Sequence, residues 1–304
     1  MKSKSFILTL ALSLVCAASA GAQESASRII EEGGLGPYKA IMRAEPTLPE
    51  HTVFVPQDLT AFGAGKKLPV LVWGNGACAN SPWEHMNFLN EIASHGYIVL
   101  ATGNIPLVDE WYKGPMSKQQ QQIESIDWII AQNSDPASPY YQKIDVDNIC
   151  LSGMSCGGLQ TLTNCADPRI KLLMICNSGL FVNGDGSIPG MPMPSKDKLK
   201  DIHTPVIYIM GGKEDIAYVN GSDDFSRIKH VPACMANFPV GHGGTYLQPH
   251  GGEFTVVALA WLDWQLKGDT EASKMFLGKR PLLRERPSWT LDRNRKMEKL
   301  KVGK

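Results

Sequence analysis

The sequence predicts one α/β domain whose central sheet is mostly parallel and carries helices on both faces. The first reason is the order of the elements, because strand-like runs alternate with helical patterns and the joints between them are short and rich in Gly and Pro. The second reason is the composition of the strands. Leu68–Trp73 and Tyr97–Ala101 are apolar with little alternation, which is typical of strands buried on both faces of a parallel sheet.

The other elements follow from apolar runs for strands and from apolar spacings of three and four residues for helices. Further strands are expected at His51–Val55, Asn148–Leu151, Leu172–Cys176, Pro205–Met210 and, as the last strand, Cys234–Val240. Helices are expected at Pro82–Ala93, Lys118–Ala131, Gly157–Cys165 and Phe254–Leu266. Phe181–Lys198 is rich in Gly, Pro, Met and Asp and follows a strand, so we expect it to form a loop or lid above the sheet.

Composition excludes several classes of protein. With 304 residues and 43% hydrophobic side chains, the chain is neither disordered nor a coiled coil. Its 30 basic and 30 acidic side chains give a formal net charge of zero, which argues against a nucleic-acid partner. The long apolar run lies at the N-terminus, so we expect no membrane-spanning helix in the body of the chain.

The N-terminus has the pattern of a secretory signal peptide. Lys2 and Lys4 precede the apolar run Phe6–Ala20, and small residues follow it. We therefore predict a cleaved signal peptide at residues 1–22 and a secreted or periplasmic protein; a retained membrane anchor is the alternative. The rest of the chain is expected to form one α/β domain at residues 23–278 and a basic C-terminal tail at residues 279–304.

That tail has ten Lys and Arg against three acidic residues, a charge of +7. We expect a solvated tail or terminal helix, and contact with an anionic surface is the alternative.

The segment that carries the chemistry is Asn148–Gly158, in which Ser155 stands between Gly153 and Gly157, after a predicted strand and before a predicted helix. Gly-x-Ser-x-Gly in that context is typical of a nucleophile elbow. The turn lifts the hydroxyl above the sheet, the small residues let the backbones pass, and the helix N-terminus points at developing negative charge. We expect Ser155 to be the nucleophile; the alternative is a Gly-rich turn with an inert Ser.

A serine nucleophile needs a base, and the base needs an orienting acid that precedes it along the chain. Asp215 follows the strand that ends at Met210, and His242 follows the last predicted strand in a Gly-rich loop. We expect Asp215 to be the acid and His242 the base. Open alternatives are Glu214, Asp223 and Asp224 for the acid and His250 for the base.

Two backbone N–H groups should stabilise the oxyanion. One is expected from Cys156, the residue after the nucleophile. The other is expected from the loop after Trp73, with Asn75 as first choice and Gly76 or Ala77 as alternatives. Residues at the same end of the strands are expected to line an apolar substrate cleft, with plain packing as the alternative; these are Trp111, Tyr112 and Met154.

The cysteines fit an exported chain, in which disulfides are permitted. If both oxyanion assignments hold, Cys78 and Cys156 flank one small site, and a disulfide between them would join the oxyanion loop to the elbow. Several of the others are expected to be free and buried. The sequence contains no Cys-x-x-Cys and no tight Cys/His cluster, so we expect no metal site.

On these residues the chain resembles the secreted α/β-hydrolases, which include cutinase-like polyester hydrolases, dienelactone-hydrolase-like proteins and the platelet-activating-factor acetylhydrolase group. The resemblance implies an α/β-hydrolase fold and hydrolysis of carboxylic esters without a cofactor. It also implies Ser155 as nucleophile, Asp215 as acid and His242 as base. It covers about His51–Asp269 and includes Ala93–Val99, Ser138–Asp145, Gly212–Asp215 and Ala260–Asp269.

Departures from that family affect the substrate rather than the reaction. Met154 and Cys156 differ from the residues common at these positions in polyester hydrolases, and Phe181–Lys198 does not align. The dienelactone branch uses a Cys nucleophile, where this chain has Ser155. We therefore predict a secreted serine esterase acting on a small-molecule or polymeric ester through an acyl-enzyme. The alternatives are an amide- or peptide-cleaving serine hydrolase and a non-catalytic binding protein of the same fold.

Overall fold

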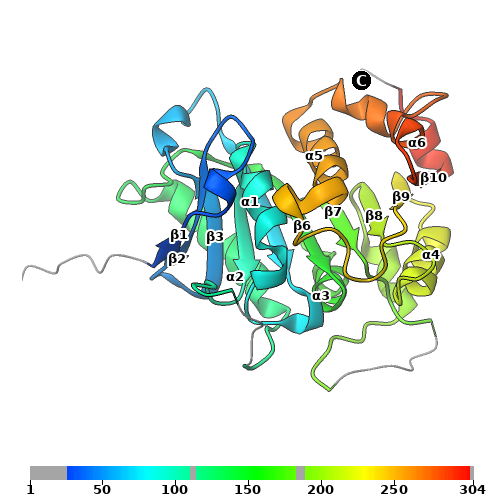
Figure 1. The fold of residues 1–304 in the computed structure, drawn as a ribbon, viewed down its shortest axis with the longest axis horizontal. Coiled ribbons are helices and arrows are strands. Elements are labelled where there is room, and N and C mark those ends of the chain that lie inside the picture. The colour runs from blue at the N-terminus through cyan, green and yellow to red at the C-terminus, as the bar shows by residue number, and fades with distance from the viewer. Residues whose placement is uncertain (1–25, 110–113, 183–188, 302–304) are drawn as a thin grey trace, which may run out of the picture.

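The computed structural model describes residues 26–109, 114–182 and 189–301. These residues form one ten-stranded sheet with helices on both faces (Figure 1). The strand order is β1-β2-β3-β5-β4-β6-β7-β8-β9-β10. From β5 through β9 every neighbouring pair is parallel, and the pairs at the two edges are antiparallel. The expectation of a mostly parallel sheet is therefore confirmed.

The strands have the following bounds. They are β1 (Ser27–Arg28), β2 (Ala40–Glu45), β3 (Leu48–Pro56), β4 (Leu68–Gly74), β5 (Ile98–Thr102), β6 (Ile144–Met154), β7 (Ile170–Cys176), β8 (Val206–Met210), β9 (Ala233–Asn237) and β10 (Thr290–Arg293). Each predicted strand overlaps one of these strands. The sequence analysis missed β1, β2 and β10.

Two apolar layers hold the helices against the sheet. α1 (Met86–Ser94) and α5 (Gly252–Lys267) pack on one face, and α2 (Gln120–Ser134), α3 (Cys156–Asn164) and α4 (Tyr218–Arg227) pack on the other (Figure 1). The short helices are α6 (Leu282–Glu285), α7 (Arg295–Glu298), η1 (Glu31–Gly33), η2 (Leu59–Ala61), η3 (Gly76–Cys78), η4 (Trp83–His85), η5 (Lys196–Asp201), η6 (Pro249–Gly251) and η7 (Ala272–Met275).

The direction of strand addition reverses at β4, and this reversal positions the site. The chain runs from β4 through α1 to β5 on one side, and then through α2 to β6 on the other. The connections leaving the carboxyl ends of β4 and β6 therefore diverge and open a crevice, which is where open α/β sheets bind ligands.

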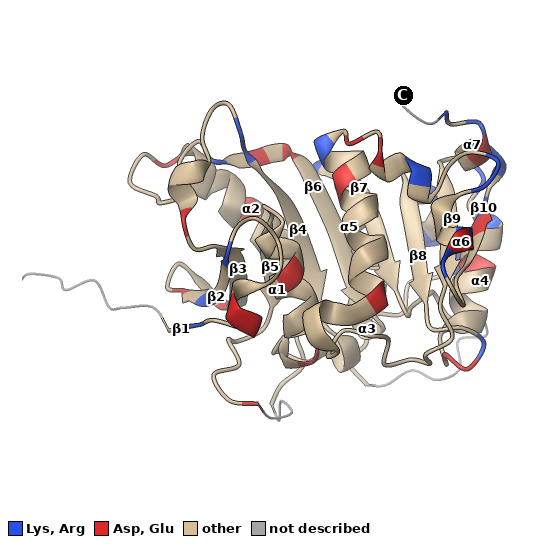
Figure 2. Ribbon diagram, turned by 45° about the horizontal axis from the view of Figure 1, so that its top comes forward, with Lys and Arg blue, Asp and Glu red and all other residues tan. Residues whose placement is uncertain are grey.

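The basic C-terminal segment, for which a solvated tail or a terminal helix was expected, contains two short helices and also a strand. In its described part, up to residue 301, α6, β10 and α7 pack against the domain, and β10 pairs antiparallel with β9 (Figure 2). Trp289 and Leu291 are buried, and Trp289 stacks on Phe238 with ring centroids 5.0 Å apart. The strand β10 was missed because the many charged residues of this segment suggested exposure to solvent, although β10 has a buried apolar residue. β9 is thus not the last strand, and it ends at Asn237 rather than Val240.

The predicted signal peptide lies outside the described residues. Within the described part of the chain, no helix is both long enough and apolar enough to cross a membrane.

Candidate active site

Ser155 occupies the sharp turn between β6 and α3. Its backbone has φ 52° and ψ −115°, an unusual conformation for a residue with a side chain. A Cβ on Gly153 would lie 2.4 Å from the carbonyl carbon of Gly157, and a Cβ on Gly157 would lie 2.0 Å from the carbonyl oxygen of Gly74. The turn can therefore form only because both flanking residues are glycines.

The structure brings Ser155, His242 and Asp215 together. His242 Nε2 lies 2.9 Å from Ser155 Oγ, and His242 Nδ1 lies 2.6 Å from Asp215 Oδ1. The three side chains come from the carboxyl ends of β6, β9 and β8. Both distances are within hydrogen-bond range, so a proton can pass between the hydroxyl and the imidazole.

Asp215 is held as a carboxylate. Burial alone would raise its pKa, but hydrogen bonds outweigh that effect and leave the pKa below its ordinary value. The donors are the His242 ring, the backbone N–H groups of Ala217 and Gly211, and the amide of Asn177. With its side chain fully buried, the carboxylate can fix the orientation of the imidazole.

Three of the four alternative candidates for the acid and the base pair with residues outside the Ser155–His242–Asp215 series. Asp223 pairs with Arg227 and Asp224 pairs with Lys196. Glu214 is exposed. His250 Nδ1 lies 3.1 Å from Glu91 Oε2 and 3.5 Å from Glu31 Oε2.

Asn177 is a site residue that the sequence analysis missed. Its amide nitrogen donates to Asp215 Oδ2 at 2.8 Å, and its amide oxygen accepts from the Tyr246 hydroxyl at 2.5 Å. It directly follows β7, the neighbour of the elbow strand. A search for polar residues at the carboxyl ends of the predicted strands would have found it.

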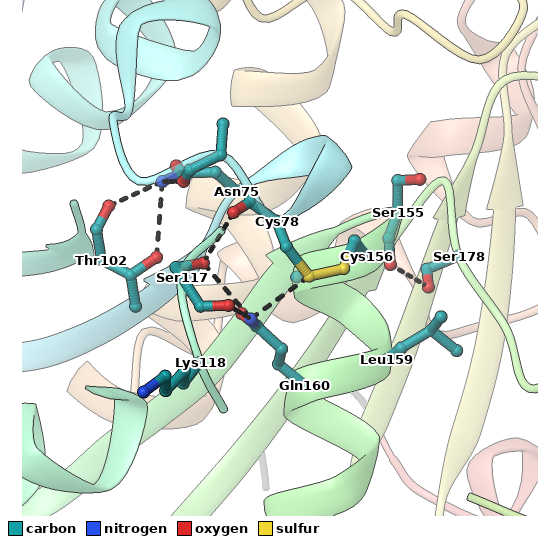
Figure 3. Close-up of a disulfide and its surroundings, with 12 residues drawn as sticks. Asn75, Cys78, Thr102, Ser117, Lys118, Ser155, Cys156, Leu159, Gln160 and Ser178 are labelled. Atoms are coloured by element: carbon teal, nitrogen blue, oxygen red, sulfur yellow. Dashed lines mark hydrogen bonds between the residues drawn. A yellow bond between two sulfur atoms is a disulfide. The ribbon is translucent and has the colours of Figure 1, made fainter. Parts of the chain in front are cut away.

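A disulfide joins Cys78, in the loop after β4, to Cys156, the first residue of α3 (Figure 3). Gln160 Nε2 reaches Cys78 Sγ at 3.3 Å and the Ser117 carbonyl at 3.0 Å. The proposed bond between the oxyanion loop and the elbow is therefore present. The other cysteines of the described residues are buried thiols.

The Cys156 N–H stands at the first position of α3, where helical N–H groups have no partner within the helix. On the facing loop, the cleft is lined by Gly76 and Ala77 rather than by Asn75. Asn75 is fully buried, and its side-chain amide donates to the Ala79 and Thr102 carbonyls. These bonds involve the Asn75 side chain only, so its backbone N–H remains the first choice for the second oxyanion donor, with Gly76 and Ala77 as the alternatives.

The cleft above Ser155 has a volume of about 410 Å³ and mostly apolar walls. Met154 is among them, as expected, together with Leu159, Phe181, Met191 and Ile216. Trp111 and Tyr112 lie outside the described residues. Within the described ranges, no group of three or more His, Cys, Asp and Glu side chains is arranged to hold a metal ion.

Comparison with known families agrees with this geometry. The profile of the PET hydrolase-like family matches residues 62–277, which is more than half of the chain. The chain belongs to the PET hydrolase-like family. That family is a cutinase-like branch of the α/β-hydrolases, so the resemblance and the fold class predicted from the sequence are confirmed, and the chain is placed among ester-cleaving hydrolases. A comparison with curated proteins found none that matches the chain.

Proposed function

We propose that this PET hydrolase-like chain is an exported serine esterase that uses Ser155, His242 and Asp215 as a catalytic triad. The observation that carries the proposal is the unbroken hydrogen-bonded series from Ser155 Oγ through His242 to Asp215. Membership of an ester-cleaving family supports the choice of an ester over an amide.

The reaction begins when His242 Nε2 takes the Ser155 proton as Oγ attacks the ester carbonyl. The oxyanion is stabilised by the N–H of Cys156 and by an N–H of the loop at Gly76. The imidazolium, stabilised by Asp215, then gives its proton to the leaving alcohol. Water activated by the same imidazole releases the acid from the acyl-enzyme.

The test is hydrolysis of p-nitrophenyl esters of graded acyl length, with Ser155→Ala as the control. Loss of the serine should reduce kcat by on the order of a thousandfold or more. Turnover that survives the substitution would contradict the assignment. Cleavage of peptides but not esters would favour an amide-cleaving enzyme, and the absence of a fluorophosphonate adduct on Ser155 in folded protein would favour a binding protein.

Export is supported by the disulfide, because such bonds persist in oxidising compartments. N-terminal sequencing of protein recovered from outside the cytoplasm should begin near residue 23. Recovery of an intact Met1 would contradict cleavage.

A further inference from the structure

The catalytic cleft adjoins a second, smaller cavity, and Glu84 lines both. The main cleft measures about 410 Å³ and the side cavity about 190 Å³. Their shared lining residues are Glu84, Met154 and Gly243. A substrate that extends from Ser155 into the side cavity must therefore pass Glu84, which belongs to the turn just before α1.

No described residue pairs with the carboxylate of Glu84. Among the described residues it is the only acidic one on the walls of the main cleft, and none of them forms a hydrogen bond or ion pair with it. Burial among apolar neighbours raises its pKa, and the charge of His242 opposes that rise. A half-buried carboxylate that no described side chain pairs with is available to a cationic ligand in the cleft, and such a pair would offset the desolvation cost of the carboxylate.

The placement of Glu84 beside the His242 loop indicates which part of the substrate meets the carboxylate. In the proposed reaction His242 must protonate the leaving alcohol, so the alcohol part of the ester lies on the His242 side of Ser155. Glu84 and His242 both line the main cleft, and Gly243, the residue after His242, lines the side cavity together with Glu84. The group that Glu84 meets therefore belongs to the alcohol, not to the acyl chain.

The side cavity suits a cation. Its walls include His85 and Tyr246, whose ring centroids are 5.0 Å apart. Burial lowers the pKa of His85 to about 3, so its imidazole is uncharged at neutral pH and does not repel a positive group. Aromatic rings beside a carboxylate are a recurrent setting for ammonium groups.

We propose that Glu84 determines specificity by pairing with an ammonium group on the alcohol part of the substrate. The preferred substrates are then esters of cationic amino alcohols, whose charged end occupies the side cavity while Ser155 attacks the carbonyl. This inference rests on the proposed esterase activity, because it places the substrate by the triad.

The experiment compares two esters of the same acid that differ only in charge, a choline ester and its 3,3-dimethylbutyl isostere. The acid is the one that is turned over fastest in the p-nitrophenyl series. Wild-type protein at low salt should favour the choline ester by at least about tenfold in kcat/KM, and Glu84→Gln should reduce that ratio to about one. The ratio should fall because kcat/KM for the choline ester decreases, and kcat/KM for the neutral ester should change by a smaller factor.

The matched control is Glu124→Gln, which removes an exposed carboxylate from α2 on the opposite face of the sheet. It should retain the wild-type ratio. Choline and 3,3-dimethyl-1-butanol, tested as inhibitors of p-nitrophenyl ester hydrolysis, give a second ratio that needs no turnover of the choline ester. Choline should inhibit wild-type protein more strongly than its isostere, and Glu84→Gln should abolish the difference.

Equal kcat/KM values for the two esters in wild-type protein, together with equal inhibition by the two alcohols, would overturn the inference and leave the esterase intact. An equal loss of both esters in Glu84→Gln would also overturn it, because Glu84 would then act on the triad rather than on the substrate. Absence of all ester turnover and of a fluorophosphonate adduct on Ser155 would overturn the proposed function and the inference with it.

Discussion

The two sides of the proposed catalytic cleft are held in place by different interactions. On the β4 and β6 side, backbones approach closely through Gly74 and Gly157, and the Cys78–Cys156 disulfide adds a covalent bond. On the β8 and β9 side, Asp215 and His242 are positioned by hydrogen bonds, several from loop residues. The nucleophile side should therefore be sensitive to added volume, and the acid–base side to the loss of single polar atoms.

The largest effect is expected from Gly157→Ala. Its Cβ would lie 2.0 Å from the Gly74 carbonyl oxygen, and neither backbone can move without opening the sheet. We expect the free energy of unfolding to fall by more than about 4 kcal/mol, measured by chemical denaturation. Gly63→Ala is the matched control, since a Cβ there meets nothing within 4 Å. Equal stability of the two variants would contradict the close packing described for the elbow.

The next effect is expected from removal of the disulfide by Cys78→Ala together with Cys156→Ala. The bond closes a loop of 78 residues, and its loss should lower the free energy of unfolding by about 4 kcal/mol. Activity should fall as well, because the loop with Gly76 is no longer fixed against α3. The control is Cys165→Ala, at a thiol that forms no disulfide. A wild-type midpoint unchanged by reductant would show that the bond does not stabilise the fold.

On the acid–base side, Asn177→Ala should reduce kcat by about thirtyfold, equivalent to about 2 kcal/mol, with little change in KM. It removes a donor to Asp215 and leaves the Tyr246 hydroxyl without its acceptor. Tyr246→Phe, which keeps the ring and the Asn177–Asp215 bond, should cost less. A larger loss in Tyr246→Phe than in Asn177→Ala would reverse the roles assigned to them.

The same substitution predicts a change with pH. The pKa of Asp215 is lowered in the folded state, so its stabilising contribution is present above the ordinary pKa and is lost as the pH falls through the folded pKa. Asn177→Ala removes one of the bonds that lower this pKa. Acid unfolding, followed by circular dichroism, should therefore begin at a higher pH in the variant. Unfolding of both proteins at the same pH would show that the Asn177 hydrogen bond does not lower the pKa of Asp215.

The smallest effect is expected at Asp224, which accepts bonds from the Leu180 N–H and from the Lys196 ammonium group. Burial raises its pKa to about 6, so the folded state binds the proton more tightly than the unfolded state. Stability should therefore decrease as the pH rises from about 4 to about 6. In Asp224→Asn the melting temperature should change less with pH over this range than in wild type. An equal dependence of melting temperature on pH in the two proteins would contradict the role assigned to Asp224.

The same contrast explains what the sequence could predict. The elbow was predictable because a strand, Gly-x-Ser-x-Gly and a helix are adjacent in the chain, and its steric demands leave few alternatives. Asn177 and Glu84 were not, because their importance arises only when the sheet brings the ends of distant strands and the turn before α1 to one cleft. The second oxyanion donor could not be singled out from the sequence either, because Asn75, Gly76 and Ala77 follow one another in the loop after β4.

The edges of the sheet were also hard to predict. β2 alternates weakly, with half-buried polar residues such as Arg43, so its apolar face is not obvious. β10 is four residues long and lies in a strongly basic segment, where charge suggested solvent. Both strands form by pairing with a neighbouring strand, β3 for β2 and β9 for β10. Such pairing depends on the tertiary fold, so the local sequence pattern does not predict it.

The most direct test of the central claim is to trap the acyl-enzyme. A p-nitrophenyl ester should be mixed with the enzyme, quenched within one turnover, and the digested protein examined by mass spectrometry. The account predicts an acyl group on the peptide that carries Ser155, formed at a rate no slower than steady-state turnover. Continued ester turnover with an unmodified Ser155, or with the acyl group on another residue, would contradict it.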